Sequence, residues 1–411
     1  MMHHGELYVT RSPPATRSVG LIRSVQDERV SEIAAPLRIG PITVDPPVVL
    51  APMAGVTDAP FRLLCASFGG GLFVNQMVTA RALLEGHPTS WELTRFHPDE
   101  PVRSLQLYGT DPHHLGEAVH KLVGEDLVDH LDINLGCPAP KVTRNGGGAA
   151  LPYKRPLLRR VIRAVTRAAH TESGGRVPVT VKFRLGIDDE HLTFLDTGRI
   201  AEEEGVAAIA LHARTALQHY APSAHWDRIA ELADTVRSIP VLGNGDVFSG
   251  DDAVRMLTET GCAGVVVGRG CLGRPWLFRE LAAALAGDPV PEPPALGEVR
   301  TTILEHVRLI REWDDDPRRM AGFRKHLSWY LKGYPVGREV RQAAGHVSSA
   351  DDVAALLAPL DPSLTATVDP ATVVRSHSNA LRRVAVPDGW LDDPDEDVHL
   401  DPEADALVSG G

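Results

Sequence analysis

The sequence predicts an α/β protein, a (β/α)8 TIM barrel followed by a small C-terminal helical bundle domain. Three observations predict this fold. Eight apolar, β-rich runs recur between residues 48 and 268, and each ends in polar residues or glycine. The gaps between these ends are about 24 to 47 residues long and hold helical patterns such as DDAVRMLTETG at 251–261. Beyond the Pro-rich stretch at 289–294 the periodicity is purely helical.

Alternation of strands with helices indicates parallel pairing, because consecutive parallel strands need a crossover between them. Several runs are continuous stretches of Val, Ile and Leu, as in strands that are buried on both faces. An open doubly wound sheet is the rival arrangement, but eight repeated units favour closure into a barrel. The eight runs end near Met53, Met77, Leu107, Cys137, Arg184, His212, Asn244 and Gly268.

The chain divides into four parts. We expect a disordered leader at 1–35, the barrel at 36–290, a helical domain at 291–383 and an acidic disordered tail at 384–411. The formal net charge is -12, but nine acidic residues and no Lys or Arg lie in the tail, so the rest of the chain is close to neutral. The part of the chain before the tail can still carry a locally basic surface, although its net charge is close to zero.

Cysteine usage and hydropathy limit the class of protein. The four cysteines lie far apart without C-x-x-C spacing, so we expect neither a disulfide framework nor a metal site. No apolar run approaches the roughly 18 residues that a membrane span needs. The sequence therefore predicts a cytoplasmic protein without a membrane partner, and it implies no particular oligomer.

Polar residues concentrate at the carboxyl ends of the predicted strands, where a barrel carries its active site. The seventh run ends in GNGDV and the eighth in VGRG. Glycine-rich turns that enter helices let backbone N–H groups approach a phosphate, although glycine also serves plain turns. Two adjacent turns of this kind predict a phosphate site that contains Asn244, Gly245, Asp246, Gly268 and Arg269.

Four other strand-end residues suit a heterocyclic ligand. Lys182 ends an otherwise apolar run, where an ammonium group can stabilise an anionic reduced flavin or merely extend to solvent. His212 is either a ligand contact or a satisfied core histidine. The amides of Gln106 and Asn134 can pair with the donor and acceptor edge of a ring, or they can be ordinary barrel-layer residues.

Cys137 ends the fourth run and opens a loop that carries Lys141, Arg144 and the run Asn145–Gly148. Most cysteines are inert small hydrophobic residues. An unperturbed thiol has a pKa of about 8.5, so it is mostly protonated at neutral pH and can act as a general acid. Its place at the catalytic face of a barrel favours that role.

The helical region holds a basic stretch between residues 317 and 341, with seven Lys or Arg and one acid, Glu339. Trp329 and Tyr330 are interleaved with these charges, which is typical of a surface that tracks phosphates and stacks bases. A solvated basic helix face is the alternative. The basic residues are Arg318, Arg319, Arg324, Lys325, Lys332, Arg338 and Arg341.

Seven segments together resemble the tRNA-dihydrouridine synthases, especially the bacterial B-type. They are APMAGVTDAPFR, LQLYG, DINLGCPAPKV, VKFRLG, HART, GNGD and GRGCLGRPW, and the likeness spans about residues 37–335. The resemblance implies that reduced FMN delivers hydride to C6 of a tRNA uridine, that the Cys137 thiol protonates C5, and that NADPH reloads the flavin.

The resemblance also implies ligand residues. It places FMN on Pro52, Met53, Ala54, Gln106, Lys182, His212, Asn244, Gly245, Asp246, Gly268 and Arg269, and Asn134 joins them as a member of the same rim. We expect tRNA to contact Lys141, Arg144, Arg214, Arg318, Arg319, Arg324, Lys325, Lys332 and Arg338.

Two residues depart from the family pattern, because Gln76 stands where many members have Glu and Pro222 replaces a glycine. Both departures put the substrate fit in question. Two rival functions stay open: a flavin barrel dehydrogenase that acts on a free pyrimidine, of the dihydroorotate type, and a non-catalytic tRNA-binding barrel protein. The basic helical region disfavours the first rival, and retention of Cys137 and Lys182 disfavours the second.

Overall fold

The computed structural model describes residues 34–314, 316–373, 381 and 383–400. The expected leader at 1–35 therefore lies outside the described residues, except for its last two. Nine short strands form one parallel sheet in the order β4-β3-β11-β10-β9-β8-β7-β6-β5. They are β3 (Val48–Leu50), β4 (Leu72–Phe73), β5 (Val78–Thr79), β6 (Ser104–Tyr108), β7 (His130–Leu135), β8 (Val179–Arg184), β9 (Ala208–His212), β10 (Val241–Asn244) and β11 (Gly264–Val267).

The sheet closes into the expected eight-unit barrel because β4 and β5 are two halves of its second strand. β4 pairs with β3 and β5 pairs with β6, both in parallel. Between them, Val74 donates its N–H to the carbonyl of Leu50, and Asn75 donates to the carbonyl of Ser104. The segment 72–79 therefore bridges the first and third strands, and the prediction of a (β/α)8 barrel is confirmed.

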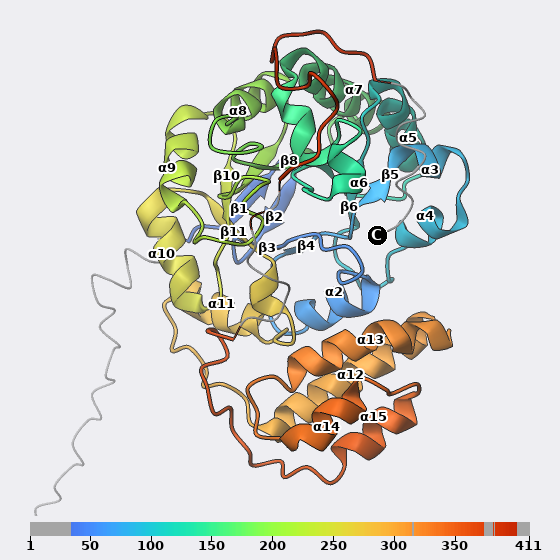
Figure 1. Cartoon of the computed structure of the whole chain (residues 1–411), viewed down its shortest axis with the longest axis vertical. Coiled ribbons are helices and arrows are strands. Elements are labelled where there is room, and N and C mark those ends of the chain that lie inside the picture. The colour runs from blue at the N-terminus through green and yellow to red at the C-terminus, as the bar shows by residue number, and fades with distance from the viewer. Residues whose placement is uncertain (1–33, 315, 374–380, 382, 401–411) are drawn as a thin grey trace, which may run out of the picture.

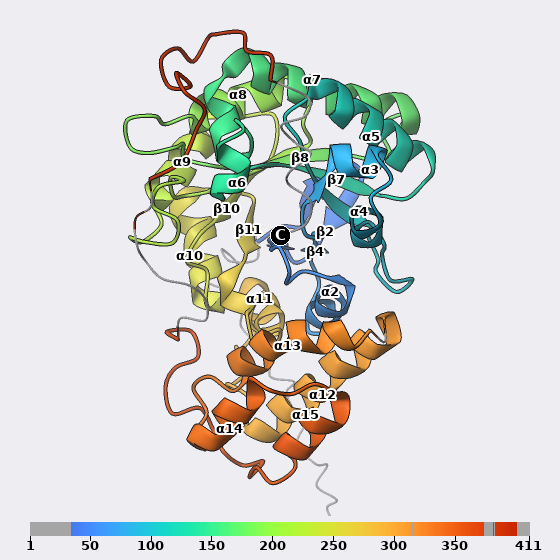
Figure 2. The same ribbon diagram turned by 45° about the vertical axis from the view of Figure 1, so that its right-hand side comes forward.

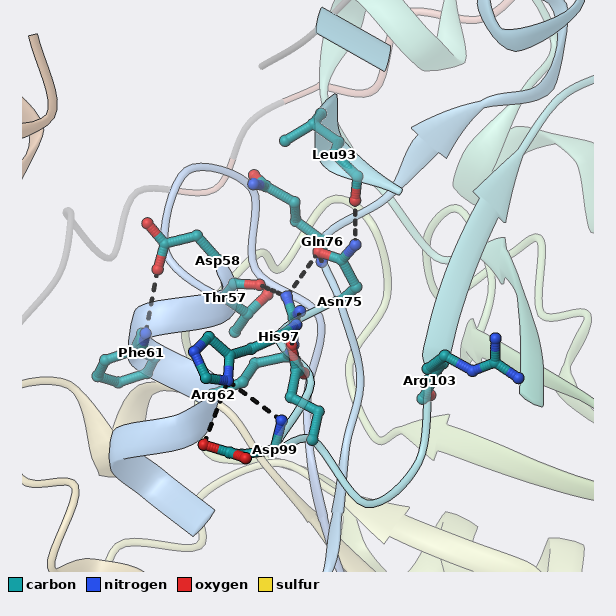
Figure 3. A network of polar contacts seen from close by, with 12 residues as sticks. Thr57, Asp58, Phe61, Arg62, Asn75, Gln76, Leu93, His97, Asp99 and Arg103 are labelled. Atoms are coloured by element: carbon teal, nitrogen blue, oxygen red, sulfur yellow. Dashed lines mark hydrogen bonds and ion pairs between the residues drawn. The ribbon is translucent and has the colours of Figure 1, made fainter. Parts of the chain in front are cut away.

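A buried polar network interrupts this second strand (Figure 3). The Oδ1 atom of Asn75 accepts the N–H of Gln76 and a hydrogen bond from Nη1 of Arg62. Arg62, which is 1% exposed, forms a bidentate ion pair with Glu100 at 2.6 and 2.7 Å. The Asn75 side chain thus accepts the backbone N–H of the next residue in its own strand. That N–H is then not available to a neighbouring strand, so the regular ladder of backbone hydrogen bonds is interrupted there.

Helices cover the outside of the barrel (Figure 1). The sequence fixes their ends locally: Ser249 accepts the N–H of Asp252 at the start of α10, and Gly261 ends that helix in the left-handed conformation. The helices are α2 (Ala59–Ala66), α3 (Ala80–Leu84), α4 (Pro88–Leu93), α5 (Pro112–Gly124), α6 (Pro140–Thr143), α7 (Arg155–Ser173), α8 (Phe194–Glu203), α9 (Trp226–Thr235), α10 (Gly250–Thr260) and α11 (Leu277–Ala286), with 3-10 turns η1 (Gly148–Tyr153) and η2 (Arg269–Cys271).

An antiparallel hairpin of β1 (Leu37–Ile39) and β2 (Ile42–Val44) closes the N-terminal end of the barrel. Its buried side chains pack with the interior residues of the barrel strands in one cluster. Leu37 lies beside Gly264, the first residue of β11. The opposite end of the barrel is therefore the one left for a functional site.

Four further helices form a separate bundle beside α2 and α11 (Figure 2). They are α12 (Leu296–Trp313), α13 (Pro317–Tyr330), α14 (Gly337–Ala344) and α15 (Ala350–Leu357), and they share their own hydrophobic core. The bundle contacts the barrel through an apolar interface, where Leu64 of α2 and Trp276 join the hydrophobic core of the bundle, and through polar links. Nζ of Lys325 donates to the carbonyl of Gly55 at 2.5 Å, and Arg319 pairs with Glu92 on α4.

Residues 384–400 of the acidic tail lie along α7 on the barrel, which differs from the expectation of disorder for this part (Figures 1 and 2). Trp390 is only 4% exposed, and its Nε1 donates to the carbonyl of Ala150. Asp395 pairs with Arg155, and Glu396 pairs with Lys154. Composition alone predicted disorder because it does not register these distant cationic partners.

Candidate active site

The carboxyl ends of the strands surround a cavity of about 470 Å³. The structure brings all twelve residues expected to hold the cofactor to this one cavity, although they come from seven separate stretches of the chain. Cys137 also lines it, and the helical bundle contributes Lys325 and Trp329. The twelve are Pro52, Met53, Ala54, Gln106, Asn134, Lys182, His212, Asn244, Gly245, Asp246, Gly268 and Arg269.

The cavity is strongly cationic on one side. Lys182, Arg184, Arg214 and Arg269 line it, and Asp246 is the only carboxylate among the described residues that do. Burial and the charge of Arg184 lower the pKa of Lys182 to about 8. Burial lowers the pKa of Arg184 to about 10. Such a group of partly desolvated cations favours an anionic ligand.

Asp246 orients two of these cations. Nη2 of Arg214 donates to both carboxylate oxygens of Asp246 at 2.6 and 2.8 Å, and Nη2 of Arg269 lies 3.3 Å from one of them. The guanidinium of Arg269 also stacks over the Tyr220 ring, 4.2 Å from its centroid. Asp246 therefore acts through the arginines, because its negative charge would repel a phosphate that approached it directly.

Arg214, expected to contact tRNA, is instead 2% exposed and lies in the wall of the cavity. Its Nε donates to the carbonyl of Pro222, the residue that replaces the family glycine. Its Nη1 is buried without a hydrogen-bond partner among the described residues. A buried guanidinium with an unused donor beside Gly245 is suited to receive an acceptor from a ligand in the cavity.

His212 ends β9 among these cations. Burial, followed by the charges of Arg184 and Lys182, lowers the pKa of His212 well below its usual value. The imidazole is therefore neutral at physiological pH and offers one donor and one acceptor. Among the strand-end residues, Asn244 is partly committed elsewhere, because its Nδ2 donates to the carbonyl of Val266.

A chain of buried hydrogen bonds runs from the barrel interior to the Cys137 loop. Oγ1 of Thr180 and Nε2 of Gln106 donate to the two oxygens of Asp132, at 2.6 and 2.7 Å. Nδ2 of Asn134 then donates to Oε1 of Gln106 at 2.9 Å, and Oδ1 of Asn134 accepts the N–H of Cys137 at 3.0 Å. Gln106 and Asn134 thus position the thiol loop as well as lining the cavity.

Cys137 follows β7 and is the only cysteine of the described chain that is not fully buried. Burial raises the pKa of its thiol, and Arg184 and Lys141 offset this only in part. The thiol is therefore protonated at neutral pH, as a proton donor must be. Its carbonyl accepts the N–H of Ala149 at 3.0 Å, so the loop folds back onto it.

The sequence prediction did not single out Arg184, Tyr220 or the cavity role of Trp329. Arg184 lies two residues after Lys182 on β8, so strand alternation places both side chains on the same face, and this signal was available. Tyr220 reaches the cavity only through the fold of its loop. Tyr330, expected to be a stacking platform, is fully buried and lies 3.1 Å from Nδ1 of His306.

The remaining expected tRNA contacts separate into two groups. Arg324 donates to the carbonyl of Val347 within the bundle, whereas Lys325 donates to that of Gly55 and so joins the bundle to the barrel. Arg319 pairs with Glu92 and Asp314. Besides Lys325, the exposed residues are Lys141 and Arg144 beside the thiol loop, and Arg318, Lys332 and Arg338 on the bundle.

Gln76, one of the two departures from the family pattern, lies behind the wall of the cavity and has a structural role there. Oε1 of Gln76 accepts the N–H of Gly55 at 2.6 Å, and the carbonyl of Gly55 accepts from Lys325. The glutamine therefore holds the loop that carries Pro52, Met53 and Ala54. A glutamate could accept the same hydrogen bond, so the substitution changes the charge here and leaves the acceptor in place.

The barrel, its cationic cavity and the thiol at the cavity rim define a (β/α)8-barrel protein with its site at the carboxyl ends of the strands. Residues 49–365 match the family model described as "Dihydrouridine synthase (Dus)". The chain belongs to the dihydrouridine synthase family, so the resemblance found in the sequence is confirmed.

Two relatives show how far the likeness extends. A "Probable tRNA-dihydrouridine synthase" of Mycobacterium tuberculosis (strain ATCC 25618 / H37Rv) is 52% identical over 382 residues, which cover 91% of this chain and 97% of the relative. The "tRNA-dihydrouridine synthase B" of Xanthomonas axonopodis pv. citri (strain 306) is 40% identical over 341 residues, which cover 82% of this chain and 98% of the relative.

Neither a membrane span nor a metal centre is found in the described part of the chain. None of its helices combines the length and the apolar character needed to cross a bilayer. Within the same residues, no three or more His, Cys, Asp or Glu side chains are grouped so that they could hold a metal ion.

Proposed function

We propose that this chain is a tRNA-dihydrouridine synthase that reduces the 5,6 double bond of specific tRNA uridines, with FMN as its flavin and NADPH as reductant. Membership of the dihydrouridine synthase family supports the reaction. The observation that carries the proposal is the position of Cys137, a protonated thiol on the rim of a cationic cavity at the catalytic end of the barrel.

The residues of the cavity fit FMN. A volume of about 470 Å³ is in the range of small-molecule sites. Arg269 and the unpartnered Nη1 of Arg214 offer donors to a phosphate, and Gly245 and Gly268 keep the backbone open beside them. Lys182 on β8 lines the same cavity and offers a positive charge to the pyrimidine portion of a reduced flavin.

The chain's own residues then have distinct tasks. FMN held by these residues would, in its reduced form, supply the hydride for C6 of the uracil, and NADPH would restore that form. Cys137 donates the proton from Sγ to C5, so one hydride and one proton saturate the double bond and a thiolate remains. Asn134 holds the backbone N–H of Cys137 and thereby orients the thiol toward the cavity. Arg184, whose Nε donates to the carbonyl of Gly136, supports the same loop and stabilises the thiolate.

We also propose that residues 36–290 form the catalytic barrel and residues 291–383 the tRNA-binding domain. The two are linked through Lys325 and Arg319. Trp329 extends from the bundle into the cavity wall, so this domain also shapes the substrate entrance. Cytoplasmic tRNA is the substrate that this arrangement suits.

The test is a single-turnover reaction of pre-reduced protein with tRNA that lacks dihydrouridine. We expect the protein to purify with bound FMN, to oxidise NADPH and to convert uridine to dihydrouridine, detected by mass spectrometry of the nucleosides. Reduction of a free pyrimidine in place of tRNA would support the dihydroorotate-type rival. A folded protein that binds tRNA but takes up no added FMN would support the non-catalytic rival.

A further inference from the structure

The segment 387–398, here called the strap, lies outside the part of the chain that matches the family model. The B-type relative from Xanthomonas is matched over 98% of its own length but covers only 82% of this chain, so this chain has terminal or inserted segments that the relative lacks. The strap is nevertheless firmly docked. Its central residue, Trp390, is 4% exposed in a tail whose composition is acidic and polar.

The strap is held by contacts on η1 and the start of α7. Nε1 of Trp390 donates to the carbonyl of Ala150 at 3.0 Å, and the hydroxyl of Tyr153 donates to the carbonyl of Leu391 at 2.9 Å. Nζ of Lys154 lies 5.5 Å from the centroid of the Trp390 ring. Lys154 is fully buried, so its charge depends on the strap for compensation.

Three ion pairs extend this contact. Lys154 donates to Glu396 and to the carbonyl of Asp393, and Arg155 forms a bidentate pair with Asp395. Arg160 pairs with Asp397. Lys154 precedes α7, Arg155 begins it and Arg160 lies in its second turn, whereas the three acids are consecutive in the strap, so the two segments are complementary in charge.

The strap packs against the loop 146–150, which contacts the backbone of Cys137. The indole stands directly over Gly146: a Cβ at this position would lie 2.7 Å from Cη2 of Trp390. Two residues later, a Cβ on Gly148 would lie 2.5 Å from the carbonyl oxygen of Cys137. The N–H of Ala149 donates to that same carbonyl at 3.0 Å. The glycine run thus lies between the tryptophan and the thiol residue, with side chains absent where the two approach.

We propose that Trp390 is a positioning residue for proton transfer, because the strap clamps the loop 146–150 and that loop fixes the carbonyl end of Cys137. This inference rests on the proposed function, since it assigns Cys137 the role of proton donor. It adds that the barrel alone does not hold the thiol in position, and that the strap is needed as well. A thiol displaced by about 1 Å can lose as much as 10²-fold in rate, so a loosened loop is a measurable defect.

The experiment measures three properties of the full-length, FMN-loaded protein. They are the single-turnover rate of dihydrouridine formation, the affinity for tRNA, and the rate at which iodoacetamide alkylates Cys137. We expect Trp390→Ala to lower the single-turnover rate about tenfold, to leave tRNA affinity unchanged and to speed alkylation several-fold. Alkylation reports on this thiol because the other three cysteines are buried.

Two variants separate positioning from general loss of stability. Trp390→Phe keeps an aromatic ring in the same place but loses the N–H donor and the outer indole atoms that approach Gly146, so we expect a rate between those of the wild type and Trp390→Ala. Trp91→Ala is the matched control, because Trp91 on α4 is likewise an indole that donates to a backbone carbonyl, that of Leu83. We expect it to change thermal stability without changing the alkylation rate of Cys137.

A further variant serves if Trp390→Ala fails to fold. Asp395→Asn combined with Asp397→Asn weakens the strap's ion pairs and leaves the indole intact, and we expect a smaller change of the same sign in rate and alkylation. Wild-type rates and alkylation in a folded strap variant would overturn the inference. Absence of dihydrouridine formation by the wild-type protein would instead overturn the proposed function, and the alkylation result would still report whether the strap holds the loop.

Discussion

The backbone of Cys137 is held from two sides by supports of different kinds. Asn134 accepts its N–H from inside the barrel, and Ala149 donates to its carbonyl from the loop that the strap covers. The inner support is a chain of buried hydrogen bonds between residues of neighbouring strands. The outer support is a segment about 240 residues distant in sequence, joined by one indole and by ion pairs that are largely exposed.

This difference decides how each support responds to its surroundings. Asp132 and Gln106 are buried and Asn134 is half-buried, and their hydrogen bonds are not ion pairs, so salt has little effect on them. The partly exposed pairs of the strap are screened by salt, and each contributes little alone. The inner support is therefore a fixed part of the barrel, whereas the outer support depends on the tail remaining docked.

The largest expected effect comes from removal of the group that both supports serve. Cys137→Ala should bind FMN and tRNA normally and accept hydride from NADPH, yet form dihydrouridine about 10²- to 10⁴-fold more slowly, because a general acid is lost. The measurement is the single-turnover reduction of unmodified tRNA by pre-reduced enzyme, which isolates chemistry from product release.

Cys137→Ser is the matched control for this prediction. It retains a side chain of similar size but carries a much weaker acid, so we expect it to be impaired to a similar degree. A near-normal rate for Cys137→Ala would show that another group donates the proton to C5. The two supports of Cys137 would then have no role in catalysis.

The next largest effect should follow loss of the inner support. Asn134→Ala leaves the N–H groups of Gly136 and Cys137 without their acceptor, and we expect the single-turnover rate to fall about 10²-fold as the thiol moves. In the Cys137→Ala background the same change should cost far less, because residues that act as one unit are not additive. Equal losses in both backgrounds would show that Asn134 acts on the flavin rather than through the thiol.

The inner support was largely open to prediction from sequence, and the outer one was not. Strand ends at Arg184, His212 and Asn244 coincide with the ends of β8, β9 and β10, because parallel buried strands leave continuous apolar runs. Gln106 and Asn134 were therefore placed on the rim correctly. Their bonds to each other and to Asp132 depend on the register of β6 against β7, which no local pattern specifies.

The errors have different causes, and for the tail the cause is that composition does not report long-range partners. The acids of the tail indicated disorder, but Lys154 and Arg155 on the barrel compensate them. Adjacent residues on a helix point in directions about 100° apart, so Trp329 reaches the cavity while its neighbour Tyr330 is buried. Met77 falls between β4 and β5 because the side chain of Asn75 interrupts that strand.

Lys182 belongs to neither support of Cys137. Its substitution therefore tests whether flavin binding in the cavity is independent of the thiol. Its pKa is lowered to about 8, so the amine is charged below that pH and becomes neutral above it. We expect Lys182→Met to weaken the preference for reduced over oxidised FMN roughly tenfold at pH 7, the scale of one lost hydrogen bond to a charged group.

The sign of the pH dependence follows from the lowered pKa. As the pH rises through 8, wild-type protein loses the same charge that the variant lacks, so the two flavin midpoint potentials should converge. The measurement is a redox titration of both proteins between pH 6.5 and 9.5. A constant difference across that range would mean that Lys182 acts by shape or that its charge persists.

The smallest expected effect concerns the helical bundle and separates tRNA binding from the positioning of Cys137. Lys332 and Arg338 are exposed on the bundle, whereas Arg324 donates to a carbonyl within the bundle and Lys325 donates to the carbonyl of Gly55 on the barrel. Each phosphate contact releases counterions, so Lys332→Ala combined with Arg338→Ala should reduce the slope of log affinity against log salt by about two units.

Binding titrations at several salt concentrations check this expectation. Arg308→Ala on α12 is the matched control, because Arg308 is an exposed cation of the bundle outside the expected tRNA contacts and pairs with Glu305 and Glu312. The single-turnover rate at saturating tRNA should stay at the wild-type value in the double variant, since neither support of Cys137 is touched. An unchanged salt slope would assign Lys332 and Arg338 to a solvated face. A changed single-turnover rate at saturating tRNA would show that the bundle also orients the uridine against the thiol. The two supports of the Cys137 backbone would then not be sufficient to define the position of the reacting groups.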